Sequence, residues 1–183
     1  SYARQDQAFK FGEPNSARAM ARAVSTTTDH IILIDPHEDN LDSYFDVPVN
    51  IYSTAHLLAD ALPTTLCDPL FLAPDAGAVE LATRVRDSYG SGKTDYLLKT
   101  RHSGEEVDLT MRDTELSDRD VVVVDDIIAT GSTLSQAVDL LNDAGASRVF
   151  ATCIHPLLVQ NARTKLETAG VEQIIATDTL ERD

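Results

Sequence analysis

The chain has 183 residues and carries thirty acidic against fifteen basic side chains, which gives a formal net charge of −15. Such a surface repels nucleic acid and anionic membranes, so we expect neither as a partner. Its two cysteines, Cys67 and Cys153, lack the spacing of metal ligands, and no apolar run is long enough to span a bilayer, which predicts a reduced, cytoplasmic setting.

The first fifty residues predict a helix, a strand and a helical turn. The helix is expected over residues 16–25, and its inner face is small or apolar: Ala17, Met20, Ala21 and Val24. The apolar run 31–34 predicts a short buried strand that ends at Asp35-Pro36-His37. A helical turn follows over 41–45, and segment 47–49 is expected to lead into a linker.

Beyond residue 50, predicted strands alternate with predicted helices. Strands are expected at 70–73, 95–100, 121–124, 149–154 and 174–176. Helices are expected at 56–62, at 79–88, from after Thr133 to Gly145, and at 156–169. Segment 101–113 is polar and is predicted to be a mobile arm. This alternation predicts an α/β fold, a parallel sheet flanked by helices.

Stretch 121–133 is the centre of the predicted site. Four consecutive valines are typical of a strand buried on both faces, and we expect that strand to stop at Asp125 and Asp126. A small, hydroxyl-rich turn then opens a helix: Thr130, Gly131, Ser132 and Thr133. Backbone N–H groups and the positive helix end favour a phosphate there.

The two carboxylates beside this turn would repel a bare phosphate. They fit a ligand that brings hydroxyl groups or a cation, so a phosphorylated sugar suits the site better. The structural alternative is a buried strand followed by an ordinarily capped helix.

Two other predicted strands also end in polar residues, Asp35-Pro36-His37 and Pro74-Asp75. Ligands of open α/β sheets bind at the carboxyl ends of strands, so these endings support one shared site. His37, between Asp35 and Asp46 in the sequence, either binds a metal or nucleotide phosphate or has a structural role.

Lys99 and Arg101 stand two residues apart, which on a strand directs both side chains to one face. They precede the polar arm in a protein with few cations. That placement fits a pair of charges that stabilises a phosphoryl transition state when the arm closes. A charged, solvated strand edge is the alternative.

Six segments together resemble one known family. They are Tyr2-Ala3-Arg4-Gln5-Asp6, Gly12-Glu13-Pro14-Asn15-Ser16-Ala17, Asp35-Pro36-His37, Ala73-Pro74-Asp75-Ala76-Gly77, Lys99-Thr100-Arg101 and Val124–Thr133. The last segment is similar to the phosphoribosyl diphosphate (PRPP) loop of the type I phosphoribosyltransferase fold. The set as a whole resembles the ribose-phosphate pyrophosphokinases (PRPP synthetases), particularly their archaeal branch, and the acidic, lysine-poor composition favours a halophilic source.

The resemblance implies the reaction of ATP with ribose 5-phosphate to give PRPP and AMP. It implies that ATP is bound by Arg4, Gln5, Asp6 and His37. It implies a Mg²⁺ site formed by Asp35, His37, Asp46 and Asp75. It implies that ribose 5-phosphate is held by Asp75, Asp125, Asp126, Thr130, Gly131, Ser132 and Thr133. It implies that the catalytic residues are Lys99, Arg101 and His37.

The chain departs from the family in three respects. Ala129 stands where bacterial relatives usually have a carboxylate, and Asn50 replaces an acid that some relatives have. The family has two similar domains, so we expect residues 1–50 to be a remnant of the first domain and 51–183 to be most of the second. The full-length protein is expected to be a homo-oligomer.

Two other functions remain open. A phosphoribosyltransferase that consumes PRPP would share the central turn but leaves Lys99 and Arg101 unexplained. A non-catalytic, regulatory subunit associated with PRPP synthetase would share the fold, and loss of His37, Lys99 or Arg101 would have favoured it. All three residues are present.

Overall fold

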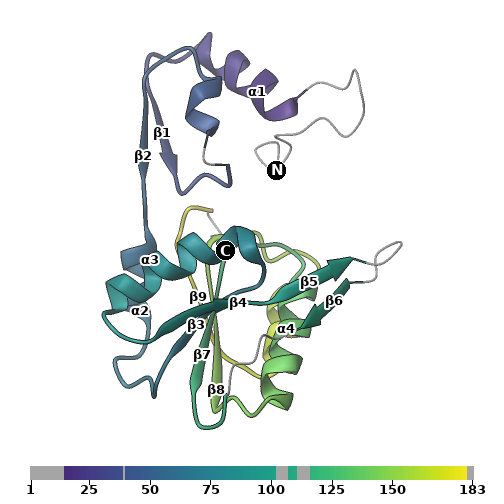
Figure 1. Cartoon of the computed structure of the whole chain (residues 1–183). Helices are drawn as coiled ribbons and strands as arrows, with labels where there is room; N and C mark the ends of the chain where they lie inside the picture. Colours follow the sequence, from purple (N-terminus) through teal and green to yellow (C-terminus); the bar gives the residue numbers. More distant parts are fainter. Residues whose placement is uncertain (1–14, 39, 102–106, 111–115, 181–183) are drawn as a thin grey trace. The chain divides into compact units, whose positions relative to one another are not determined.

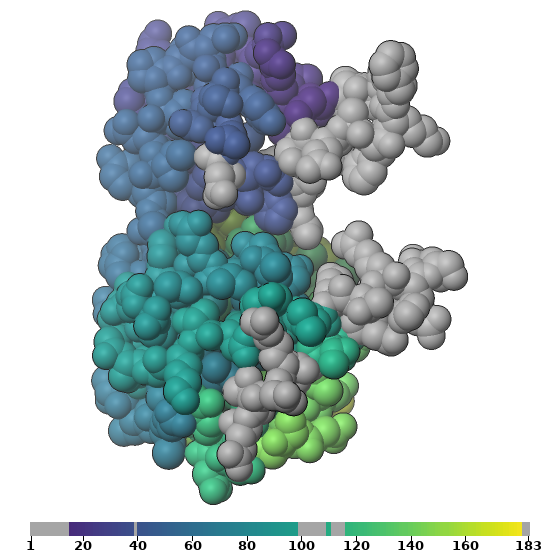
Figure 2. All heavy atoms as spheres, in the orientation of Figure 1, coloured from purple at the N-terminus to yellow at the C-terminus, as the bar shows by residue number. Residues whose placement is uncertain are grey.

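The computed structural model describes residues 15–38, 40–101, 107–110 and 116–180. Arg4, Gln5 and Asp6 lie outside these residues, so their predicted contacts with ATP stay predictions. The chain divides into two compact units, Ser1–Thr54 (unit 1) and Ala55–Asp183 (unit 2), drawn as a ribbon in Figure 1 and with all heavy atoms in Figure 2.

Unit 1 contains a two-stranded parallel sheet. Its elements are α1 (Ser16–Ser25), β1 (Ile31–Ile34), the 3-10 helix η2 (Leu41–Tyr44) and β2 (Val49–Tyr52). α1 begins where predicted, because the Asn15 side chain accepts a 2.8 Å hydrogen bond from the backbone N–H of Arg18. The linker predicted after segment 47–49 is wrong, since β2 pairs with β1 in parallel from Ile31↔Val49 onward.

The predicted burial of unit 1 is only partly correct. Ala17 and Ala21 of α1 are buried, but Met20 and Val24 on the same predicted face remain 42% and 38% exposed. On β1, Ile32 is 61% exposed, because a sheet of two strands buries little apolar surface.

Unit 2 contains a five-stranded parallel sheet in the order β4-β3-β7-β8-β9 (Figure 1). The strands are β3 (Leu70–Ala73), β4 (Lys93–Tyr96), β7 (Asp120–Ile128), β8 (Arg148–Pro156) and β9 (Val171–Ala176). The helices are α2 (Ala55–Ala61), the 3-10 turn η3 (Ala76–Ala78), α3 (Val79–Tyr89), α4 (Ser132–Asp143) and α5 (Ala162–Thr168). This arrangement confirms the predicted α/β fold.

The core of unit 2 lies on both faces of β7. Alternate residues of β7, Val121 and Val123, pack with Leu134 and Val138 of α4 and with Leu166 of α5. The other two valines of the run, Val122 and Val124, are also fully buried. The sequence prediction of a strand covered on both faces is therefore confirmed.

Two predicted segments of unit 2 have a different structure. The single strand expected at 95–100 is two strands, because the chain leaves the main sheet after β4 and starts the hairpin of β5 (Leu98–Arg101) and β6 (Val107–Thr110). The helix expected at 156–169 begins only at Ala162. Pro156 still belongs to β8, and Gln160 and Asn161 have φ of +54° and +60°, which no helix accommodates.

An ion pair between the buried Asp120 and the partly exposed Arg148 anchors the amino end of β7. The carboxylate of Asp120 is 1% exposed and accepts bonds from Arg148 Nε at 2.9 Å, Arg148 Nη2 at 2.6 Å and the Cys67 N–H at 2.7 Å. Burial alone would raise the pKa of Asp120, but these donors hold that pKa below its ordinary value. Asp120 thus joins β7, β8 and the segment before β3.

Among the residues that the structure describes, no helix has the length and apolar character needed to cross a membrane.

Candidate active site

Two carboxylates stand near the carboxyl end of β7. We predicted that the strand would stop at Asp125 and Asp126, and this boundary is wrong, because pairing with β8 continues through Asp125↔Cys153 and Ile127↔His155 to Ile128. Both acids are therefore held by strand geometry. The Asp126 N–H donates to Asp125 Oδ1 at 2.9 Å, which fixes the two residues further.

The ionised form of the Asp125 carboxyl group is disfavoured by its surroundings. Burial, the negative charge of Asp126 and the more distant charge of Asp75 together raise the pKa of Asp125 to about 8. The charges of Asp126 and Asp75 thus both affect the pKa of Asp125, although Asp75 follows a different strand. Asp75 is held in place by its own turn, where its side chain accepts a 3.0 Å bond from the Gly77 N–H.

The predicted phosphate turn lies directly between β7 and α4. Gly131 has φ +72°, and a Cβ at this position would lie 3.3 Å from both the Cβ and the carbonyl oxygen of Ala162. No side chain caps α4 at Gly131, and α4 has no acid in its first turn. The helix end therefore keeps its positive character for a ligand.

The hydroxyls of the turn form a short chain of hydrogen bonds. The Ser132 N–H donates to Thr130 Oγ1 at 3.5 Å, and Thr130 Oγ1 donates to Ser132 Oγ at 3.3 Å. Thr133 is partly buried in the first turn of α4. The turn thus presents backbone and hydroxyl donors in a small volume, which is chemistry suited to an oxyanion.

Lys165 of α5 also contacts this turn, although the sequence reasoning did not select it. Its Nζ lies 3.3 Å from the Thr130 carbonyl oxygen and 3.4 Å from Ser132 Oγ. Nothing local in the sequence relates Lys165 to the turn more than thirty residues earlier. The only signal was the scarcity of lysine, since the chain has four.

In unit 1, Asp35 holds the protein's own backbone. It is 6% exposed with φ +35°, and its Oδ2 accepts bonds from the Thr54 N–H at 2.6 Å and the Thr54 hydroxyl at 2.7 Å. His37 is exposed and lies 3.9 Å from Glu38. Asp46 is exposed and donates its N–H to Ser25 Oγ. The predicted roles of all three residues stay predictions.

Lys99 and Arg101 both belong to β5, where they pair with Leu109 and Val107 of β6. They are thus placed on a hairpin outside the main sheet, at the start of the arm that the sequence predicted. Residues 102–106 lie outside the described residues, so the predicted mobility of the arm stays a prediction.

A magnesium ion fits part of this site. In the described ranges no three His, Cys, Asp or Glu side chains form a ready-made metal cluster. Mg²⁺ does not require one, because it usually binds to one or two carboxylates together with substrate phosphates and water. Burial first, and then the charges of Asp126 and Asp75, raise the pKa of Asp125, and a nearby cation would favour its ionised form. We therefore keep Asp75, Asp125 and Asp126 as candidates for contact with a cation or with hydroxyl groups.

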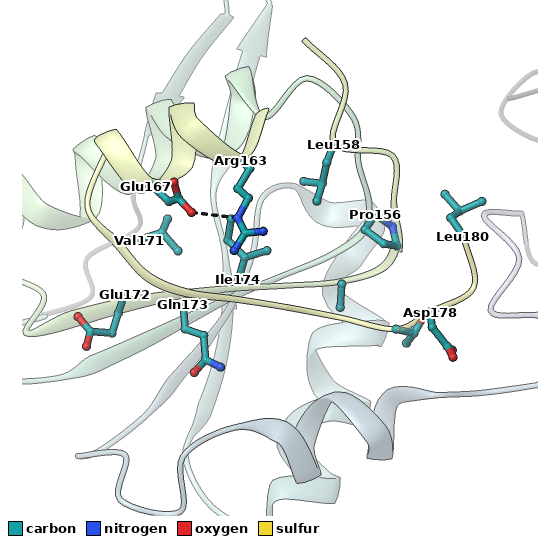
Figure 3. Close-up of a pocket in the computed structure, with 12 residues that line it drawn as sticks. Pro156, Leu158, Arg163, Glu167, Val171, Glu172, Gln173, Ile174, Asp178 and Leu180 are labelled. Atoms are coloured by element: carbon teal, nitrogen blue, oxygen red, sulfur yellow. Dashed lines mark hydrogen bonds and ion pairs between the residues drawn. The ribbon is translucent and has the colours of Figure 1, made fainter. Parts of the chain in front are cut away.

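A separate cavity of about 900 Å³ lies beside α5 and the edge strand β9 (Figure 3). Its acidic lining residues are Glu167, Glu172 and Asp178, and Arg163, which is the one cation among the described residues that line it, pairs with Glu167 at 3.0 Å. None of the predicted site residues lines it. An acidic cavity suits an anionic substrate poorly, so size alone does not make it the active site.

Comparison with known proteins agrees with this geometry. The family described as "Phosphoribosyl transferase domain" matches residues 42–179. A ribose-phosphate pyrophosphokinase from Halobacterium salinarum is 52% identical over 180 residues, which are 98% of this chain and 63% of that protein. One from Methanopyrus kandleri is 44% identical over 182 residues, 98% of this chain and 62% of that protein. The chain thus spans less than two thirds of the length of these relatives.

Solved structures give the same result. The crystal structure of phosphoribosylpyrophosphate synthetase from Mycobacterium smegmatis matches with a TM-score of 0.84 and 30% identity, covering 98% of this chain and 59% of that one. A purine phosphoribosyltransferase from Pyrococcus horikoshii matches with a TM-score of 0.53 at 19% identity, covering 82% of this chain and 90% of that one, which shows a shared fold alone.

Proposed function

Because the chain belongs to the phosphoribosyl transferase domain family, we propose that it carries the sugar-phosphate site of a ribose-phosphate pyrophosphokinase. The reaction transfers the diphosphoryl group of ATP to the C1 hydroxyl of ribose 5-phosphate and yields PRPP and AMP. The relatives at 44–52% identity bear the name of this activity. The observation that carries the proposal is the junction of β7 and α4, where two carboxylates precede a turn rich in hydrogen-bond donors.

In this proposal, the turn from Thr130 to Thr133 binds the 5-phosphate. The N-terminal N–H groups of α4 and the hydroxyl groups donate to the phosphate oxygens. Gly131 allows the backbone to approach the phosphate closely, since it has no Cβ and adopts a left-handed conformation.

Asp125 and Asp126 then accept hydrogen bonds from the ribose hydroxyls and orient C1 toward the nucleotide. Held on a strand, they need little reorganisation when the sugar binds. Asp75 contributes from the carboxyl side of β3, next to β7 in the sheet. Mg²⁺ would neutralise part of the charge of the triphosphate, and the residues proposed as its ligands are Asp75 in unit 2 and Asp35, His37 and Asp46 in unit 1.

Lys99 and Arg101 stabilise the charge that develops as the C1 oxygen attacks the β-phosphorus of ATP. Arg4, Gln5, Asp6 and His37 bind the nucleotide. We further propose that residues 1–50 belong to a domain similar to that of 51–183, and that the complete protein is a homo-oligomer in the cytoplasm.

The first test is enzymatic. The chain is assayed for AMP and PRPP formation with ATP, ribose 5-phosphate and Mg²⁺, alone and fused to the region of the Halobacterium salinarum relative that it does not span. We expect little turnover alone and clear turnover in the fusion. If neither protein releases AMP, or if release does not depend on ribose 5-phosphate, the proposal is wrong.

The second test concerns the turn. Gly131→Val is compared with Gly90→Val, because both glycines have positive φ, but a Cβ at Gly90 meets nothing within 4 Å. Calorimetry should show that Gly131→Val loses ribose 5-phosphate binding while Gly90→Val keeps it. Equal affinities of the two variants for ribose 5-phosphate would show that the turn does not bind the phosphate.

The competing function, a phosphoribosyltransferase that consumes PRPP, is tested in the same preparations. It requires pyrophosphate release from PRPP when a nucleobase is added, with no need for ATP. We expect no such release.

A further inference from the structure

The phosphate turn rests on α5 and on the segment before it. The Leu158 and Val159 N–H groups donate at 2.9 Å to the carbonyl oxygens of Ile128 and Ala129, where β7 runs into the turn. Ala162 lies under Gly131, and Lys165, one helical turn later, reaches Thr130 and Ser132. The shape of the turn therefore depends on α5 as well as on its own sequence.

Lys165 brings a positive charge to a turn that has none. Segment 129–133 contains no Lys or Arg, it follows two aspartates, and the whole chain has a net charge of −15. A sugar phosphate carries nearly two negative charges at neutral pH, and helix-end N–H groups contribute only about half a positive charge. A lysine within hydrogen-bond distance of the turn changes this balance substantially.

The hydrogen-bond geometry also directs the hydroxyl of Ser132. A hydroxyl group has two acceptor positions and one proton to donate. Ser132 Oγ lies 3.3 Å from the Thr130 hydroxyl and 3.4 Å from Lys165 Nζ, and because an ammonium group can only donate, Lys165 occupies an acceptor position of Ser132 Oγ. The proton of Ser132 therefore points away from Lys165 and is available to donate to a phosphate bound at the helix end.

We propose that Lys165 is a positioning residue for the 5-phosphate of ribose 5-phosphate: it orients the Ser132 hydroxyl through the bond to Oγ and supplies the positive charge that the turn lacks. This inference rests on the proposed function, because the ligand is the one assigned to the turn there.

The test is calorimetric titration of the full 183-residue chain with ribose 5-phosphate, with unphosphorylated ribose as the reference ligand. The variants are Lys165→Gln and Lys165→Arg, and the matched control is Arg163→Gln. Arg163 lies on the same helix, is 77% exposed at its side chain and pairs only with Glu167 among its described ion pairs. Its replacement changes the net charge by the same amount.

We expect Lys165→Gln to weaken ribose 5-phosphate binding by about tenfold or more, as for loss of a charge-assisted contact. Lys165→Arg should restore most of the affinity, Arg163→Gln should leave it unchanged, and the melting temperature of Lys165→Gln should stay close to that of Arg163→Gln. Binding of unphosphorylated ribose should not distinguish the variants.

Two results would overturn the inference while the proposed function survives. In one, Lys165→Gln binds ribose 5-phosphate as tightly as the unchanged chain. In the other, Lys165→Arg loses as much affinity as Lys165→Gln and both melt at lower temperature, which would make Lys165 a purely structural link between α5 and the turn. If the unchanged chain itself does not bind ribose 5-phosphate, the site assigned under the proposed function fails first.

Discussion

The two units contain the same kind of parallel strand pairing but differ in how completely it is covered. In unit 2 the four valines of β7 are 0% exposed, with a neighbouring strand on each side and helices on both faces. In unit 1 the pair of β1 and β2 leaves Ile32, Ile51 and Tyr52 between 45% and 61% exposed. Parallel strands are normally buried on both faces, so unit 2 has what such a sheet requires and unit 1 does not.

The difference separates the two halves of the proposed site. The acids and the turn of unit 2 are held by β7, β8 and α5, so the sugar-phosphate half is built on a complete sheet. Asp35 of unit 1 is occupied with the backbone and hydroxyl of Thr54. We therefore expect sugar phosphate to bind to this chain more readily than ATP.

The largest expected effect on the unfolding free energy comes from removing a buried side chain from the core of unit 2. Phe71→Ala removes a 0% exposed ring that contacts Tyr89 at 5.6 Å between centroids and should lower the unfolding free energy by about 3–5 kcal/mol. Ile32→Ala, at a 61% exposed position, should change it by less than about 1 kcal/mol. Urea unfolding measures both, and equal losses would mean that the units do not differ in packing as described.

The next effect comes from removing the partner of the buried carboxylate of Asp120. Arg148→Ala leaves the Asp120 carboxylate buried with only the Cys67 N–H as a described partner and should cost about 3 kcal/mol of unfolding free energy. The control is Arg163→Ala, which breaks an exposed pair on α5 and should cost less than about 0.5 kcal/mol. A similar cost for both changes would show that the Asp120 pair contributes no more than a surface contact.

A smaller effect is expected on the pH dependence of stability. The pKa of Asp125 is raised to about 8 in the fold, so its contribution to stability is complete below its ordinary value and is lost as pH rises toward 8. Asp125→Asn removes this loss and should raise the melting temperature at pH 8.5 by about 2–4 °C, with a gain that shrinks toward pH 4. A gain that is the same at both pH values would show that Asp125 is not the titrating group. Asp139→Asn, on α4, provides the matched control.

The smallest effect should be confined to unit 1. Asn15→Ala removes the cap of α1 and should destabilise that helix by about 1 kcal/mol, visible as faster amide exchange of α1. Amide exchange of β7 should not change. Faster exchange in β7 would show that the stability of unit 2 depends on α1.

The sequence predicted those elements whose signal is local. Strands Ile31–Ile34 and Leu70–Ala73 and helix Ser16–Ser25 have the expected bounds. β7 was predicted too short, because adjacent aspartates are typical of a strand end, whereas pairing with β8 carries the strand past them. β2 was missed because Pro48 and Asn50 favour a loop, and only its pairing with β1 makes it a strand.

The same distinction between local and long-range signals applies to the residues of the candidate site. The acids and the turn follow one another in sequence, so a strand–turn–helix pattern is enough to group them. Lys165 could not be found that way, because its contact with Ser132 depends on how α5 packs. The interaction of Asp75 with Asp125 likewise depends on which strand lies beside β7, and β3 and β7 are far apart in the chain.

That strand order also has a kinetic consequence. Leu70 of β3 pairs with Val121 of β7, about fifty residues later, and the hairpin of β5 and β6 lies between them. During synthesis β3 therefore leaves the ribosome well before the strand that covers its inner edge. Such long-range closure slows folding and leaves apolar strands exposed to aggregation in the meantime. Only after β7 has been translated can β3 gain a partner on its inner edge, so a pause in translation before β7 would prolong the interval in which β3 is prone to aggregation.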